Sequence, residues 1–375
     1  MSKSTAKNYL KLVLVISFVY LFLVSIGLMG AAFKGFGKGF AENLLQTTSN
    51  PFVGLFIGIL ATSLVQSSST TTSIVVGMVA SGVITIGNAV PIIMGANIGT
   101  TVTNTLVSLG HITRKEEFRR AVAGATVHDF FNLICVAIMF PIELATGFLQ
   151  KLATGLAGLF ENVGGIKFTS PIKMATKPAV NFIKNLFVEI FHSEPNIGYI
   201  FILIISGIVM YLALYFIVKL MKSLVIKRTE AVFDQVLGRN GLIGIFAGLF
   251  FTIIVQSSSI TTSLLIPLIG AGIITVETVF PITMGANIGT TATAILASFA
   301  TGNISAIIVA FVHFLFNVIG VLFIYPIKIF REIPIRLAKG LGNLAFKKRR
   351  YAIIYVISVF FVIPLVLITI SKLFK

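Results

Sequence analysis

The sequence predicts an all-α integral membrane protein made of two related copies. Hydrophobic residues make up 56% of the chain, and charged residues make up only 11%. Soluble domains carry charge on about a quarter of their residues, so this composition is typical of membrane proteins. A polar motif that occurs twice within apolar sequence indicates the two copies. We therefore expect two inverted-topology repeats, each with a re-entrant helical hairpin and a broken helix, plus flanking transmembrane helices.

Four apolar stretches reach the length of about 20 residues that a helix needs to cross a bilayer. They cover Leu12–Phe33, Ile197–Val218, Ile304–Tyr325 and Tyr351–Ile370. A spanning β-strand would need only about 10 residues and would alternate polar and apolar side chains, so these stretches predict helices. The first is longer than the apolar core of a signal peptide, about 7 to 15 residues, so we expect it to be retained.

The copies are defined by two motifs that return at a constant offset of 190 positions. VQSSS at Val65–Ser69 returns at Val255–Ser259, and MGANIGTT at Met94–Thr101 returns at Met284–Thr291. We therefore expect five units along the chain. They are an N-terminal transmembrane helix (1–40), repeat 1 (41–146), an extracellular loop, connecting transmembrane helix and cytoplasmic segment (147–230), repeat 2 (231–327), and a basic cytoplasmic segment with a C-terminal transmembrane helix (328–375).

The loop after the second motif indicates how the copies are oriented. In copy one it is HITRKEEFRR, at His111–Arg120, whereas in copy two it is the uncharged ATGNISA, at Ala300–Ala306. Cytoplasmic loops collect Lys and Arg, so we expect inverted copies, with the first loop cytoplasmic and the second external. The same rule places the N-terminus and Lys328–Arg350 in the cytoplasm of a multi-pass cell (inner) membrane protein. It also accounts for the net charge of +17 without nucleic-acid binding.

Each QSSS motif lies where a helix is too short to cross the membrane. Pro51–Val65 would be roughly 22 Å long as a helix, against a hydrocarbon thickness of about 30 Å. Ser69–Val83 is similarly short, so we expect two half-helices that meet at Gln66–Ser69, with the same arrangement in Gly241–Gly272. Broken backbone at this depth is tolerated only where it is buried in protein or lines an aqueous cavity. The break itself therefore predicts a binding cavity.

This cavity should be electrically neutral but rich in N–H groups and oxygen atoms. No charged residue occurs between Pro51 and Gly110, and Glu277 is the only one between Gly241 and Val312. Half-helix N-termini suit an anion, whereas hydroxyl and amide oxygens suit a hard cation. Because an isolated buried anion is costly, we expect it to move together with a cation such as sodium.

Less specific explanations account for some of these patterns. Serine and threonine often bond back to their own helix, and the Gly-x-x-x-Gly motifs at Gly54 and Gly244 predict close helix packing. His128 and Asp129 could suggest a hydrolase. However, neighbouring residues on a helix point about 100° apart, and copy two has His313 followed by phenylalanine. We expect no enzyme; instead, the side chains of His128, His313, Asn132 and Asn317 should bond across the repeat interface.

The two copies, together with FRRAVAGATVHDFFN at Phe118–Asn132 and PIRLAKGLGN at Pro334–Asn343, resemble the type II sodium-dependent phosphate cotransporters, in a bacterial version. The resemblance implies sodium-driven import of inorganic phosphate by alternating access. It implies phosphate binding by Gln66, Ser67, Ser68, Ser69, Asn97, Ser257, Ser258 and Ser259. It implies sodium ligands at Gln256, Ser257, Asn287, Thr290 and Thr293, with the copy-one counterparts Gln66, Asn97 and Thr100.

No cofactor is expected besides sodium as the coupling ion, and the expected partners are phosphate, sodium and membrane lipid. Animal members have an external loop with cysteine pairs, but Cys135 is the only cysteine here, so no such disulfide is expected. Two alternatives stay open. One is a sodium-coupled carrier of another oxyanion or a dicarboxylate, and the other is an ion channel.

Overall fold

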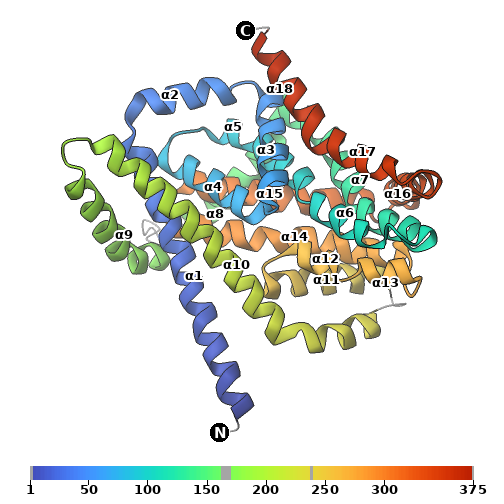
Figure 1. The fold of residues 1–375 in the computed structure, drawn as a ribbon. Helices are drawn as coiled ribbons and strands as arrows, with labels where there is room; N and C mark the ends of the chain where they lie inside the picture. The colour runs from blue at the N-terminus through green and yellow to red at the C-terminus, as the bar shows by residue number, and fades with distance from the viewer. Residues whose placement is uncertain (1–2, 162–169, 237–239, 374–375) are drawn as a thin grey trace.

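The computed structural model describes residues 3–161, 170–236 and 240–373, and the regular elements in these ranges are all helical (Figure 1). The first half comprises α1 (Lys3–Gly35), α2 (Gly37–Thr48), α3 (Pro51–Val65), α4 (Ser68–Ser81), α5 (Ile86–Gly99), α6 (Val102–Ser108), η1 (Leu109–His111), α7 (Lys115–Thr146), α8 (Phe148–Glu161) and α9 (Pro171–Ile190). The second half comprises α10 (Pro195–Val236), α11 (Gly241–Val255), α12 (Ser258–Ser263), α13 (Ile266–Ala271), α14 (Val276–Thr301), α15 (Ile304–Ile324), α16 (Lys328–Lys347), α17 (Arg350–Ile357), the π-helical η2 (Ser358–Val362) and α18 (Ile363–Leu373).

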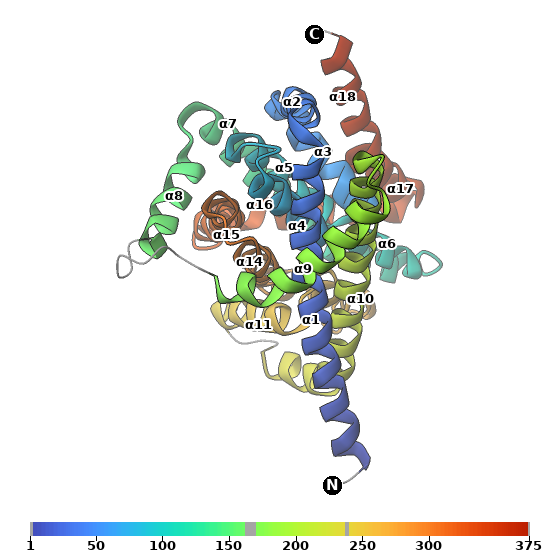
Figure 2. The same ribbon diagram turned by 90° about the vertical axis from the view of Figure 1, so that its left-hand side faces the viewer.

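Seven helical segments among the described residues are long and apolar enough to cross a membrane. They include the four stretches that the sequence predicts, and α1 and α10 lie side by side (Figures 1 and 2), with stacked rings of Phe18 and Phe216 4.9 Å apart. The prediction of an all-α membrane protein is confirmed. The complete set of spans is Lys7–Gly35, Ile86–His111, Lys115–Thr146, Pro195–Leu224, Val276–Thr301, Ile304–Ile324 and Arg350–Ser371.

The two predicted hairpins are present, and they turn in the same way. α3 ends at Val65 and α4 begins at Ser68, while α11 ends and α12 begins at the matching positions of copy two. Gln66 and Gln256, with φ of 55° and 59°, are the only non-glycine residues of the described chain in the left-handed region. A left-handed residue at this position ends the helix, and the next helix begins two residues later. Copy two adds a second short break, between α12 and α13.

The interruption expected in both MGANIGTT motifs occurs in copy one only. There α5 ends at Gly99 and α6 begins at Val102, although both belong to one membrane span. In copy two, α14 continues through the motif without a break. The Thr290 hydroxyl donates to the carbonyl of Ala286 at 3.1 Å, inside the helix. The matching Thr100 hydroxyl makes the same bond, to the Ala96 carbonyl at 2.9 Å, so this bond does not account for the difference between the copies.

Glycines hold α3 against α5 and α11 against α14. A Cβ atom on Gly95 would lie 1.9 Å from the Leu55 carbonyl oxygen, and one on the matching Gly285 would lie 1.9 Å from that of Ile245. A Cβ atom on Gly58, in the first Gly-x-x-x-Gly motif, would lie 2.1 Å from the Ile92 oxygen. The expected role of these motifs in close helix packing is therefore confirmed.

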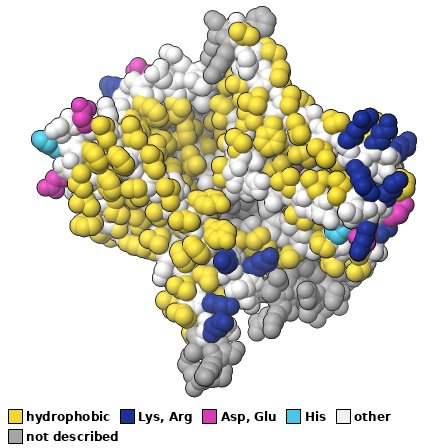
Figure 3. Space-filling view, viewed as in Figure 1, with side chains coloured by type: hydrophobic (Ala, Val, Ile, Leu, Met, Phe, Trp, Pro, Cys, Tyr) yellow, Lys and Arg dark blue, Asp and Glu magenta, His cyan; other side chains and the backbone are white. Residues whose placement is uncertain are grey.

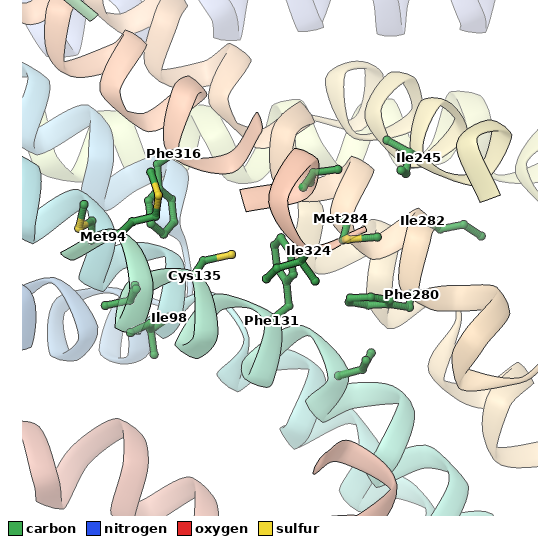
Figure 4. Close-up of a cluster of buried hydrophobic side chains, with 14 of the residues drawn as sticks. Met94, Ile98, Phe131, Cys135, Ile245, Phe280, Ile282, Met284, Phe316 and Ile324 are labelled. Atoms are coloured by element: carbon green, nitrogen blue, oxygen red, sulfur yellow. The ribbon is translucent and has the colours of Figure 1, made fainter. Parts of the chain in front are cut away.

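The two copies share one apolar core (Figure 4). Met94 and Ile98 of copy one and Phe280 and Met284 of copy two belong to one buried cluster. The ring of Phe131, on α7, meets that of Phe280 edge-on, with centroids 5.9 Å apart. A continuous core of this kind places the elements of both copies in one rigid frame, so their motifs have fixed relative positions.

The structure also describes the segment after repeat 1 and the basic segments of the chain. The stretch expected to be an external loop after residue 147 contains the helices α8 and α9, and α9 packs against α1. The basic segment Lys328–Arg350 contacts the basic loop of copy one, because a guanidinium N–H of Arg349 donates to the Thr113 carbonyl at 3.1 Å. Lys and Arg side chains gather at this edge, on the right of Figure 3.

Candidate binding cavity between the two copies

Both QSSS motifs line one cavity of about 370 Å³. The lining is completed by α10, which belongs to neither copy. None of the described residues in this lining is charged, so the predicted neutral, oxygen-rich cavity is confirmed for the described part of the chain. Its residues are Leu64, Val65, Gln66, Ser67, Ser68, Ser69, Thr70, Tyr211, Leu214, Tyr215, Val218, Gln256, Ser257, Ser258 and Ser259.

The first serine of each motif caps the half-helix that follows. The Ser67 hydroxyl accepts from the Thr70 amide at 3.2 Å, and the Ser257 hydroxyl accepts from the Ile260 amide at 3.3 Å. The amides of the two serines that follow each cap have no partner within the helix, because a first turn lacks preceding carbonyls. Two sets of N–H groups and serine hydroxyls therefore face one neutral cavity, which is an arrangement that suits a tetrahedral anion.

In copy two, the glutamine of the motif is joined to α14. The Thr293 hydroxyl donates to Gln256 Oε1 at 2.8 Å, and Gln256 Nε2 donates to the Ile253 carbonyl at 2.6 Å. Thr290 lies one turn before Thr293, so both hydroxyls lie on the same side of α14. Amide and hydroxyl oxygens are the ligands that a hard cation such as sodium prefers. The hydrogen bond thus brings together two of the predicted sodium ligands, Gln256 and Thr293, and Ser257 follows Gln256 in the chain.

The matching group in copy one is not joined in this way. Thr103, which matches Thr293, has a buried hydroxyl without a partner in the described part of the chain, and Gln66 is exposed. The same contrast holds within the hairpins. Thr252 and Thr261 share a 2.7 Å hydrogen bond, whereas the hydroxyl of Thr62, which matches Thr252, is unpaired among the described residues. Matching residues thus make different side-chain hydrogen bonds in the two copies.

Asn97 and Asn287 are buried and do not line the cavity. His128 Nε2 lies 2.6 Å from Asn287 Oδ1, and Asn287 Nδ2 donates to Asn132 Oδ1 at 2.7 Å. Asn132 in turn donates to the Asn97 carbonyl at 2.8 Å, and Asn317 Nδ2 donates to Asn97 Oδ1 at 3.2 Å. The expected bonding across the repeat interface is confirmed for His128, Asn132 and Asn317.

Three other interpretations of the sequence concern His313, Thr100 and a possible hydrolase. His313 Nδ1 is without a partner among the described residues, so its part in the interface bonding is not found. Thr100 donates to the Ala96 carbonyl at 2.9 Å and, like Asn97, lies outside the cavity lining. His128 bonds to an asparagine and not to a serine, so the hydrolase arrangement does not form. The assignment of individual residues to phosphate or sodium stays a prediction.

The sequence analysis missed the side of the cavity that α10 forms. Tyr211 and Tyr215 are part of the lining, and Lys219 Nζ lies 5.7 Å from the Tyr215 ring centroid. These three residues are spaced by four, so they share one face of an otherwise apolar helix. The spacing of these three residues is visible in the sequence, but nothing in the repeat pattern connects them to the QSSS motifs.

Asp129 is a second feature that the sequence analysis set aside. Its side chain is 0% exposed, the Thr105 hydroxyl lies 3.5 Å from Oδ2, and Oδ1 is unpaired among the described residues. The side chains of Thr101 and Tyr355 also face the carboxylate. An ionisable group inside a membrane is expensive to bury, and such groups mark ion pathways. The position of Asp129 in an apolar helix was the signal that could have identified it.

Comparison with known proteins adds an independent observation. The sequence profile of the Na+/Pi-cotransporter family matches residues 21–163 and 209–322. The chain is 36% identical to sodium-dependent phosphate transport protein 2B of Homo sapiens over 451 residues, covering 96% of this chain and 65% of the relative. It is 36% identical to protein 2A of Ovis aries over 427 residues, covering 95% of this chain and 67% of the relative.

The chain thus spans about two thirds of the length of these curated relatives. No solved structure matches it. The profile covers both QSSS motifs, which line the cavity. It also covers both MGANIGTT motifs, which contain Asn97 and Asn287 of the buried hydrogen-bond network. The chain belongs to the Na+/Pi-cotransporter family.

Proposed function

We propose that the protein is a sodium-coupled secondary transporter that imports inorganic phosphate across a cell membrane by alternating access. The observation that carries the proposal is the single neutral cavity in which the two QSSS motifs meet. Membership of the Na+/Pi-cotransporter family and the printed names of the relatives support phosphate as the anion and sodium as the coupling ion. No chemical step is required, because the cavity binds and releases its ions unchanged.

Phosphate would bind between the capped half-helices α4 and α12. The amides and hydroxyls of Ser68, Ser69, Ser258 and Ser259 would replace the water that the anion loses. These groups are dipoles and not cations, so the net charge of the anion must be offset in another way. Sodium ions held at Gln256, Ser257 and Thr293, and at the Asp129 carboxylate, would provide that offset. Coupling follows, because each ion lowers the cost of binding the other.

The two copies would be inverted, and each holds the end of the other copy's hairpin. Arg120 Nε donates to the Gly270 carbonyl at 2.8 Å, and Asn303 Nδ2 donates to the Ala80 carbonyl at 3.1 Å. Gly270 and Ala80 occupy matching positions, 190 residues apart. The contact of Arg120 is made at the end of α13, at the right of Figure 1, whereas Gly302, next to Asn303, lies beside Lys173 of α9, at the left. This supports alternating access through two hairpins with opposed exits.

Those two contacts should have opposite effects on accessibility. In a Cys135→Ala background with Ser68→Cys as reporter, Arg120→Ala should increase labelling by an impermeant thiol reagent from one side of the membrane. Asn303→Ala should increase labelling from the other side, because each substitution frees a different hairpin end. The labelling rate from each side of sealed vesicles gives the result. Faster labelling from the same side in both variants would contradict inverted hairpins.

The function is tested by radiolabelled phosphate uptake into proteoliposomes under an inward sodium gradient, with equal potassium as the control and the voltage clamped. Accumulation above equilibrium with sodium alone is the expected result, since only a coupled carrier concentrates its substrate. Accumulation of another oxyanion or a dicarboxylate in place of phosphate would make the substrate wrong. Passive leakage without accumulation would favour a channel.

The site assignment predicts that sodium and phosphate affinities respond to different residues. Gln256→Ala and Thr293→Val should each raise the sodium concentration for half-maximal uptake about tenfold, and the double variant should add little, because the two share one hydrogen bond. Ser68→Ala should mainly weaken phosphate affinity. Thr283→Val is the matched control, because its hydroxyl bonds within α14 at 3.1 Å to Val279. Wild-type sodium activation in Gln256→Ala and Thr293→Val would contradict the assignment.

A further inference from the structure

The helix α16 connects the ends of two membrane spans without being one. Three residues separate it from the end of α15, and two residues separate it from the span Arg350–Ser371. Its 20 residues would extend roughly 30 Å. However, it carries five Lys or Arg residues and Glu332, and it does not qualify as a span. A charged helix between two span ends lies at the membrane boundary.

One face of α16 is already occupied. Ile335, Ala338, Leu341 and Ala345 are buried, and α16 packs against α7. A Cβ atom on Gly342 would lie 2.5 Å from the Arg119 carbonyl oxygen, so the two helices are in close contact. This face satisfies the usual need of an amphipathic helix to bury one apolar side.

A second apolar face of α16 is uncovered. Ile329 is 74% exposed, Ile333 40%, Leu337 45% and Leu344 46%. Spacings of four, four and seven residues place these side chains on one stripe, roughly 80° wide at 100° per residue. The buried residues lie on a different side of the helix. Four large aliphatic side chains in one exposed stripe require an apolar environment.

Basic residues flank the stripe and continue beyond the end of the helix. Lys347, Lys348, Arg349 and Arg350 are exposed, and none of them forms an ion pair within the described ranges. By contrast, Arg336 pairs with Glu332 and Lys339 pairs with Glu277. Figure 3 shows this concentration of Lys and Arg at one edge. Unpaired cations at the boundary attract the phosphate groups of anionic lipids.

We propose that α16 lies in the plane of the cytoplasmic leaflet and binds anionic lipid. The stripe of Ile329, Ile333, Leu337 and Leu344 inserts between acyl chains, while Lys347–Arg350 bind the phosphate headgroups. A lipid monolayer provides both environments at the depth where α16 joins the two spans. The clustering of cations beside the stripe favours lipid over a protein partner, whose surface would need a matching acidic patch.

The proposal is tested with a tryptophan reporter, because the chain contains no tryptophan of its own. Leu337→Trp places it in the stripe, and Asn343→Trp places it on the charged face of the same helix. Each variant is reconstituted in phosphatidylcholine vesicles that contain either brominated phosphatidylcholine or brominated phosphatidylglycerol. We expect tail-brominated lipid to quench the tryptophan at 337 at least twice as strongly as that at 343.

Headgroup selection is measured in the same vesicles. Brominated phosphatidylglycerol should quench the Leu337→Trp reporter at severalfold lower mole fraction than brominated phosphatidylcholine. This preference should fall to about one when Lys347, Lys348, Arg349 and Arg350 are all replaced by glutamine. Replacing the α9 lysines Lys173, Lys177 and Lys184 by glutamine is the charge control and should leave the preference unchanged. Absence of quenching at position 337, as when protein covers the stripe, or equal quenching by both lipids, would overturn the proposal.

Discussion

Replacing Gly95 or Gly285 by alanine is expected to destabilise the folded protein strongly. The added methyl group would lie 1.9 Å from a carbonyl oxygen of the facing helix in either copy, and that oxygen belongs to rigid backbone. Relief requires α3 and α5, or α11 and α14, to move apart, and overpacking of this kind costs about 1–3 kcal/mol or more. We expect loss of the monodisperse peak in size-exclusion chromatography and a large fall in melting temperature.

The matched control is Gly207→Ala in the apolar span α10. A methyl group there meets nothing within 4 Å, so the variant should retain the parent melting temperature. Both substitutions add the same group to a membrane helix and differ only in the space available. If Gly95→Ala and Gly207→Ala melted together, the close approach of α3 to α5 would not be a feature of the protein in detergent.

The hairpins were predictable because each is encoded by a few adjacent residues. A serine that can cap a helix follows each glutamine, and short apolar segments flank both motifs. The duplication then showed that two hairpins exist. The sequence predicted that His128 bonds across the repeat interface, although not that its partner is Asn287, because both residues belong to matched motifs of different copies. Local chemistry and internal repetition therefore account for the site's main components.

Other features depend on the whole fold, so the local sequence could not predict them. Gln66 and Gln256 lie in identical QSSS motifs. However, only Gln256 accepts a hydrogen bond from a threonine that follows the second motif, Thr293. Identical motifs with different side-chain hydrogen bonds show that surrounding elements decide which bonds form. The same limitation concealed α10, since Tyr211 and Tyr215 line the cavity through tertiary packing. It also concealed α8 and α9, whose amphipathic sequences resemble a long polar loop.

Replacing Asp129 by asparagine is expected to raise the sodium concentration for half-maximal uptake at least tenfold. The amide keeps the shape of the carboxyl group and its contact with Thr105, but it removes the negative charge. Opposite unit charges 4 Å apart attract by about 4 kcal/mol at an effective dielectric constant of 20, and a tenfold change needs only about 1.4 kcal/mol. Sodium-dependent phosphate uptake, measured over a range of sodium concentrations, gives the result.

Glu143→Gln provides the control, because Glu143 is another buried carboxylate on α7. Its oxygens accept from the Leu149 amide at 2.6 Å and the Gln150 amide at 3.3 Å, so it caps α8 and has a structural role. The control should lower the melting temperature without changing sodium activation. Asp129→Asn should do the reverse, since the unpaired Oδ1 offers its charge to an ion and not to a helix end. Equal sodium activation in both variants would remove Asp129 from the proposed coupling mechanism and leave the predicted ligands Gln256, Ser257 and Thr293 as the candidates.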